Sequence, residues 1–125
     1  MSLVLASASA SRAAMLRQAG LDFETRPARV DEDEIKLSLK AEGASPRQAA
    51  ESLAELKARR AARDDADSFI IAADQMLACE GAWYDKPASM ADARAQLLSL
   101  RGKTHELTSA VVLARGGCII WRHIN

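Results

Sequence analysis

A short apolar run that gives way to alternating serines constrains the fold of this chain more than any other feature. Residues 3–6 are typical of a buried strand, and a turn with Ser7, Ser9 and Ser11 leads into a helical pattern that starts at Arg12. The first N–H groups of a helix are unpaired and its dipole is positive there, so this turn and the arginine predict an anion site suited to phosphate. The same serines could instead do no more than cap the helix.

The alternation of apolar runs and polar breaks along the chain predicts an α/β fold. Helices are expected near residues 11–19, 45–63 and 90–100, and strands near residues 3–6, 21–28, 69–73, 76–78, 83–84, 104–114 and 118–124. The spacing of apolar residues over 35–39 leaves a short helix or an irregular segment equally open. With a helix there, the order is β-α-β-α-α-β-β-α-β-β. It mixes crossover units with hairpins and predicts a mixed sheet flanked by helices in one domain over residues 1–125.

Charge and hydropathy argue against several classes of partner. Lys and Arg total 17 and so do Asp and Glu, so no global field attracts a nucleic-acid polymer or an anionic membrane. We find no apolar run of membrane-spanning length and no basic start of a signal peptide, and we expect a cytoplasmic protein. The isolated Cys79 and Cys118 are consistent with reduced thiols there, and two scattered histidines do not suggest a metal cluster.

Asp74 is the strongest single candidate for a catalytic residue. It follows the continuous apolar run of residues 69–73, which is typical of a central strand buried on both faces. We expect Asp74 at the end of that strand, where open α/β sheets place their ligand crevice. A carboxylate there could hold a divalent cation or act as a general base toward water. The alternative is an aspartate that only caps a turn.

Three other charged residues are candidates, each with a simpler alternative. Glu32 could be a second metal carboxylate, although a run of acidic residues is commonly a solvated loop. Lys57 falls on the core-facing stripe of the 45–63 helix, where it would need an anionic partner or would extend to solvent. Lys86, before a proline, could be an ordinary surface lysine. Trp83 and Trp121 are interpreted as core residues rather than as base-stacking platforms. Together, an anion site, lysines and two separated carboxylates are the groups that phosphoryl chemistry requires.

These motifs, taken in order, resemble those of the Maf family. Members of this family, also called septum-formation inhibitor or Maf-like proteins, are nucleoside triphosphate pyrophosphatases. Leu-Ala-Ser-Ala-Ser-Ala-Ser-Arg at residues 5–12 is similar to the family's Leu-Ala-Ser-x-Ser-Pro-Arg-Arg. Further matches are Val-Asp-Glu at 30–32, Leu-Ala-Glu-Leu-Lys-Ala at 53–58, Ala-Asp-Gln at 73–75, Lys-Pro at 86–87 and Leu-Arg-Gly-Lys-Thr-His at 100–105.

The resemblance implies a Maf/ITPase-like nucleotide-binding fold and a reaction. Water would cleave a nucleoside triphosphate between its α and β phosphates, with Mg²⁺ or Mn²⁺, to give a nucleoside monophosphate and pyrophosphate. Asp74 would accept the proton and Glu32 would assist with metal or water, so both are implied metal ligands. Gln75, where the dTTP/UTP branch has threonine, is similar to the 7-methyl-GTP branch. The implied triphosphate-binding residues are Ser7, Ser9, Arg12, Lys57 and Lys86.

Two departures from the family pattern affect these expectations. Ala10 and Ser11 stand where the family has proline and arginine, and losing a charge-assisted bond there would cost roughly 1–3 kcal/mol. Family members are also longer, which predicts a fold that lacks its C-terminal part and one wall of the base pocket. An edge strand exposed in this way would allow association into a homodimer.

Two other hypotheses remain beside the enzyme. The chain could be a truncated, catalytically weak nucleotide-binding module with a role in regulating cell division. It could also be a structural fragment that needs a second copy or a further segment to fold.

Overall fold

The structure is a computed structural model that describes residues 2–125. The order of its elements is the predicted one. The strands are β1 (Leu3–Leu5), β2 (Glu24–Thr25), β3 (Phe69–Cys79), β4 (Ala82–Tyr84), β5 (Glu106–Arg115) and β6 (Cys118–Ile124). The helices are α1 (Ala10–Gln18), α2 (Glu32–Ala41), α3 (Pro46–Ala61) and α4 (Met90–Leu100).

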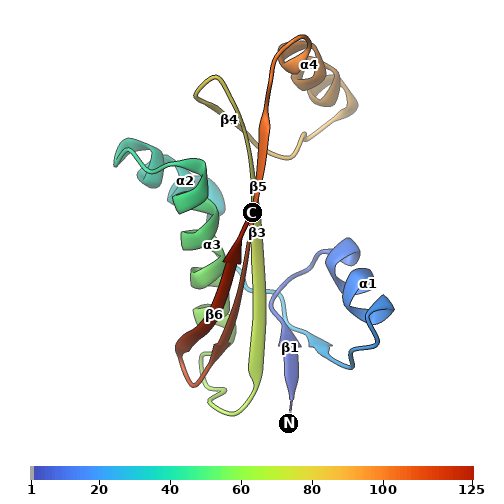
Figure 1. Cartoon of the computed structure of the whole chain (residues 1–125), viewed down its shortest axis with the longest axis vertical. Helices are drawn as coiled ribbons and strands as arrows, with labels where there is room; N and C mark the ends of the chain where they lie inside the picture. The colour runs from blue at the N-terminus through green and yellow to red at the C-terminus, as the bar shows by residue number, and fades with distance from the viewer. Residues whose placement is uncertain (1) are drawn as a thin grey trace.

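The strands form one mixed six-stranded sheet, as predicted. Its order is β2-β1-β3-β5-β6, and β4 pairs with β3 beside this path. β1 runs parallel to β2 and β3, whereas the β3–β4, β3–β5 and β5–β6 pairs are antiparallel. Figure 1 shows α2 and α3 on one side of β3 and α1 on the other, with α4 and the β3–β4 hairpin at one end of the molecule.

Helix α3 covers one face of the sheet and forms the core with it. The Ser45 hydroxyl accepts a hydrogen bond from Gln48 N, the Gln48 side chain accepts one from Ser45 N, and Pro46 occupies the first helical turn. Small side chains on its inner face let the helix lie close to the strands. The buried residues of α3 are Ala49, Ala50, Leu53, Ala54, Lys57, Ala58 and Ala61.

Strand β3 is longer than the sequence indicated, and the expected place of Asp74 at a strand end is wrong. β3 continues to Cys79, and Asp74 pairs with Ala110 of β5 in the middle of the strand. A distant segment causes the difference, because β5 supplies backbone partners for the residues before and after Asp74. The residues that follow therefore keep alternating between the two faces of the sheet.

The predicted 21–28 strand is also wrong in extent, since only Glu24 and Thr25 form β2. Arg26 N still donates to Leu5 O at 2.8 Å, but the next residue, Pro27, has no N–H to continue the ladder. The acidic stretch is the first turn of α2, capped by Asp31, so its interpretation as a solvated loop is wrong too. Residues 35–39, for which the sequence left a helix or an irregular segment open, belong to this helix.

The two predicted hairpin turns are confirmed, but the two tryptophans differ from each other. Gly81, Gly116 and Gly117 all have positive φ, as tight hairpin turns require. Trp83 packs against the core, whereas Trp121 is 53% exposed, which corrects its assignment to the core. Among residues 2–125 there is no helix long and apolar enough to cross a membrane.

Candidate active site

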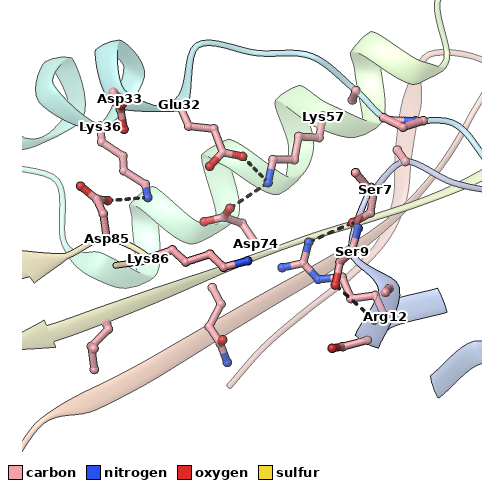
Figure 2. A pocket seen from close by; sticks show the side chains of 18 of the residues that line it. Ser7, Ser9, Arg12, Glu32, Asp33, Lys36, Lys57, Asp74, Asp85 and Lys86 are labelled. Carbon is pink, nitrogen blue, oxygen red and sulfur yellow. Dashed lines mark hydrogen bonds and ion pairs between the residues drawn. The ribbon is translucent and has the colours of Figure 1, made fainter. Parts of the chain in front are cut away.

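One large pocket brings together every site residue predicted from the sequence. It has a volume of about 1180 Å³, which is ample for a nucleotide. The β1–α1 turn, the start of α2, the middle of α3 and β3, and the segment after β4 surround it (Figure 2). The predicted residues that line it are Ser7, Ser9, Arg12, Glu32, Lys57, Asp74, Gln75 and Lys86.

The serine turn after β1 is held by its own hydroxyls. Ser9 caps α1 by accepting from Arg12 N at 3.3 Å, and the buried Ser7 hydroxyl accepts from Ser9 N at 3.0 Å. Arg12 Nη1 donates to the same Ser7 Oγ at 3.3 Å. The capping role is therefore confirmed. The turn also keeps the arginine at the pocket wall, beside the positive end of α1.

Lys57 joins the two predicted carboxylates. Its Nζ lies 2.6 Å from Glu32 Oε1 and 2.9 Å from Asp74 Oδ1, although Glu32 begins α2 and Asp74 belongs to β3 (Figure 2). The Lys57 and Asp74 side chains are only 10% and 6% exposed. A buried ammonium and carboxylate must be paired, so this contact accounts for a lysine on the core-facing stripe of α3.

Asp74 keeps one oxygen without a protein partner. Within the described residues, Asp74 Oδ2 is buried and makes no hydrogen bond. Burial raises the pKa of Asp74, and the neighbouring Lys57 opposes this shift without cancelling it. A buried carboxyl with a raised pKa and a free oxygen is a candidate proton acceptor.

Gln75 faces the opposite side of β3 from Asp74 because side chains alternate along a strand. It is exposed, and its Nε2 donates to Ser109 Oγ of β5 at 3.1 Å. A second pocket of about 470 Å³ opens on this side and shares lining residues with the first, among them Arg12 and Gln75. Its remaining walls are mainly apolar, including Leu16, Ile71 and Val111.

The sequence did not indicate Lys36 and Asp85, which also line the large pocket. Lys36 of α2 and Asp85, which follows β4, form an ion pair at 3.0 Å across one end of the large pocket. The spacing of Lys36, four residues after Glu32, would place both on one face of a helix. The sequence left a helix or an irregular segment equally open there, so this spacing alone did not identify Lys36. Nothing in the sequence indicated the contact with Asp85.

The donor set is compatible with a divalent cation completed by substrate. Glu32 and Asp74 offer carboxylate oxygens, which Mg²⁺ and Mn²⁺ prefer, and Asp74 Oδ2 is unpartnered. The described residues contain no cluster of three or more His, Cys, Asp or Glu side chains suited to a metal. Such an ion would therefore take its other ligands from phosphate oxygens and water, the usual arrangement for Mg²⁺.

Two solved structures share the fold of this chain. A HAM1 protein from Coxiella burnetii superposes with a TM-score of 0.58 and 17% identity, covering 99% of this chain and 68% of that chain. A Mycobacterium abscessus protein described as a nucleoside-triphosphatase or dITP/XTP pyrophosphatase gives a TM-score of 0.57 and 18% identity, covering 100% and 70%. These likenesses, at low identity, define the class as an α/β protein with the HAM1 fold.

Sequence comparison then gives the family. The profile described as "Maf-like protein" matches residues 2–124, and the chain belongs to the Maf family. A nucleoside triphosphate pyrophosphatase of Granulibacter bethesdensis is 52% identical over 125 residues, which are 100% of this chain and 64% of that protein. A 7-methyl-GTP pyrophosphatase of Rhizobium meliloti is 45% identical over 123 residues, 98% and 62% of the respective lengths. The chain thus spans less than two thirds of these relatives.

Proposed function

We propose that this protein hydrolyses nucleoside triphosphates between the α and β phosphates, releasing a nucleoside monophosphate and pyrophosphate. The observation that carries the proposal is the Lys57 ammonium between Glu32 and Asp74 in a pocket whose opposite wall is the serine turn. Anion-binding groups and a proton-accepting carboxylate thus face one space. The relatives named nucleoside triphosphate pyrophosphatase support the same reaction class.

The cationic side of the pocket would bind the triphosphate. Arg12 can present its guanidinium to phosphate oxygens while the Ser7 and Ser9 hydroxyls hold the turn in place. Lys86 approaches from the segment after β4, and Figure 2 shows it extending into the pocket. Positioning and charge neutralisation supply most of the catalysis in phosphoryl transfer, so these contacts would lower the barrier directly.

Asp74 would act as the general base. As water attacks and the bond between the α and β phosphates breaks, the Asp74 carboxylate takes the proton that the water loses. Lys57 holds the other oxygen of Asp74 at 2.9 Å and so fixes the orientation of the carboxylate. The raised pKa brings this base closer to neutral pH, where proton transfer is most efficient.

Glu32 and Asp74 would hold Mg²⁺ or Mn²⁺ together with the phosphates. When bound, the cation would neutralise charge on the phosphate oxygens. The proposal predicts that a chelator abolishes turnover and that added Mg²⁺ or Mn²⁺ restores it.

The second pocket is where we propose that the nucleoside lies. Its apolar walls suit a flat base, and it shares Arg12 and Gln75 with the phosphate side. Gln75 is held by Ser109, and its carbonyl oxygen is available to read the edge of a base. A 7-methylated guanine is one candidate, since relatives 43–45% identical are named 7-methyl-GTP pyrophosphatase.

Product analysis tests the proposal. The protein is incubated with Mg²⁺ or Mn²⁺ and a panel containing 7-methyl-GTP, GTP, dTTP and UTP, and pyrophosphate and orthophosphate are measured separately. We expect pyrophosphate and monophosphate in equal amounts. Orthophosphate and a diphosphate would overturn the assignment of the cleaved bond. Metal-dependent nucleotide binding without turnover would favour the binding-module hypothesis.

A further inference from the structure

One face of α2 carries three side chains spaced one turn apart, and each contacts a residue outside the helix. Glu32 contacts Lys57 of α3. Lys36 contacts Asp85, which follows β4, and Lys40 contacts Trp83 of β4. The i, i+4 spacing puts all three in one row. The helix therefore links the carboxylate end of the pocket to the β3–β4 hairpin.

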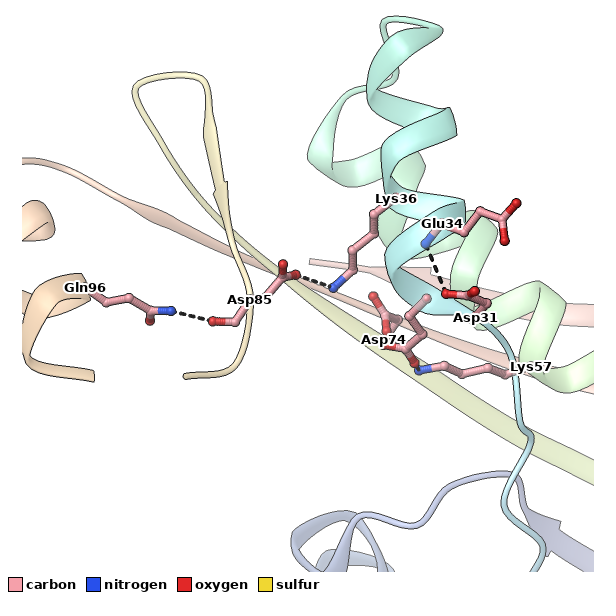
Figure 3. A network of polar contacts seen from close by, with 8 residues as sticks. Asp31, Glu34, Lys36, Lys57, Asp74, Asp85 and Gln96 are labelled. Atoms are coloured by element: carbon pink, nitrogen blue, oxygen red, sulfur yellow. Dashed lines mark hydrogen bonds and ion pairs between the residues drawn. The ribbon is translucent and has the colours of Figure 1, made fainter. Parts of the chain in front are cut away.

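Asp85 is fixed from two sides. Its carboxylate accepts from Lys36 Nζ at 3.0 Å, and its backbone carbonyl accepts from Gln96 Nε2 of α4 at 2.6 Å (Figure 3). The Lys36 side chain is 17% exposed and that of Asp85 is 62% exposed, so water is largely excluded from the lysine but reaches the carboxylate. One turn along α2, Lys40 Nζ lies 5.4 Å from the centre of the Trp83 ring, a cation–π contact with the same hairpin.

Lys86 depends on this anchoring because it comes directly after Asp85. Among the described residues it makes no ion pair, and its side chain extends freely into the pocket (Figure 2). Its place over the pocket is thus set by the backbone at Asp85. Helix α4, which follows, has no buried residue, so the α4 end of the molecule has little core of its own to hold that backbone.

We propose that the Lys36–Asp85 ion pair is a positioning device that sets Lys86 and Glu32 on opposite sides of the triphosphate. This inference deepens the proposed function and rests on it. Lys36 acts through its neighbours rather than on the substrate, because its ammonium is already bound by Asp85 at the pocket end.

Two substitutions separate this role from direct phosphate binding by Lys36. Lys36→Met and Asp85→Asn should each raise KM for the nucleotide by about 5- to 20-fold, with a smaller change in kcat. The double variant should be no worse than either single one, since both remove the same contact. If Lys36 were itself a phosphate ligand, Asp85→Asn would free its charge and lower KM, and that result would overturn the proposal.

A matched control comes from another ion pair on the same hairpin. Lys103 Nζ lies 3.5 Å from Glu80 Oε2, and neither residue lines the pockets described above. Lys103→Met removes a lysine of the same type from the same end of the molecule. We expect its KM and kcat to equal those of the unsubstituted protein. If Lys103→Met raised KM as much as Lys36→Met does, loss of a positive charge alone would explain the effect. That result would contradict the proposal.

A second measurement distinguishes failure of the ion-pair role from failure of the proposed function. The chain has two tryptophans, so in a Trp121→Phe background the fluorescence reports on Trp83 alone. Lys36→Met and Asp85→Asn should both increase quenching of Trp83 by acrylamide, because the hairpin is released from α2. Unchanged quenching and unchanged KM overturn the positioning role. Absence of turnover in the unsubstituted protein would instead overturn the proposed function, and the quenching would still show whether the pair holds the hairpin.

Discussion

Lys57 and Asp74 are buried together, so each needs the other's charge. Removing one partner of such a pair leaves an uncompensated charge, at a cost of about 3–5 kcal/mol. Lys57→Met should therefore lower the free energy of unfolding by about 3 kcal/mol at pH 7. Urea denaturation measures this change. The Lys57→Met/Asp74→Asn double variant should recover much of the loss.

The pH dependence of that variant follows from the pKa of Asp74. Burial already raises this pKa, and loss of Lys57 removes the main opposing effect. A carboxyl whose folded pKa lies above its unfolded value loses stability as pH rises through the folded value. The free energy of unfolding of Lys57→Met should thus be closer to that of the unsubstituted protein at pH 5 than at pH 7. An equal deficit at both pH values would contradict the pairing argument.

The contribution of Asp65 to stability should have the opposite dependence on pH. Hydrogen bonds from Arg26 and Ser68 lower its pKa to about 2 from an ordinary value of 3.8. Its contribution to stability is complete above the unfolded value and is lost as pH falls toward 2. In Asp65→Asn, the free energy of unfolding should fall less steeply between about pH 4 and 2, as measured by urea denaturation. Asp67→Asn, at an exposed position nearby, should leave the steepness unchanged.

The residues of the candidate site could be selected from the sequence, but their contacts could not. Serines at a strand–helix turn and a lysine on an apolar stripe are local signals, and all eight predicted residues line one pocket. The bond between Lys57 and Glu32 depends on how α2 crosses α3, and that geometry has no local signal. The same is true of Lys36 and Asp85, which are 49 residues apart.

At the level of elements, α3 depends on its N-terminal cap. Ser45→Ala removes the hydroxyl that Gln48 N bonds at 3.1 Å, and we expect a loss of about 1 kcal/mol in the free energy of unfolding. Ser52→Ala, an exposed position within the same helix, is the control and should be neutral or slightly stabilising. Urea denaturation compares the two. Equal effects would mean that the capping box does not stabilise α3.

The order of the elements was predictable because each has its own period, cap or turn. Ser45-Pro46 marks the start of α3, and glycines mark both hairpins. The extents of β2 and β3 were not predictable in the same way. A strand ends where its partners end, and the partners of β3 include β5, which follows α4 in the chain.

At the scale of the whole molecule, an edge of the sheet is the surface most suited to self-association. β6 lies at one end of the strand order, and Ile120 and Trp121 on it are 52% and 53% exposed. An edge strand with exposed apolar side chains is a surface for pairing with a second copy. We therefore predict concentration-dependent association, measured by sedimentation velocity.

A charge on the edge strand tests that prediction. Ile120→Lys should shift the equilibrium toward monomer, because a lysine on an edge strand opposes pairing. Met90→Lys, which changes an 86% exposed apolar residue of α4, should leave the association unchanged. A monomer at all concentrations, or equal effects of the two substitutions, would contradict pairing through β6.

Pyrophosphate release by Asp74→Asn tests whether Asp74 is the proton acceptor. With Mg²⁺ and the preferred nucleotide, we predict a decrease in kcat of about 100-fold or more, because the proton acceptor is lost. The variant should keep its fold, because Lys57 retains its ion pair with Glu32 at 2.6 Å. Asp22→Asn, at an exposed position outside both pockets, should retain full turnover. Undiminished turnover by Asp74→Asn would contradict the role of Asp74 as the proton acceptor.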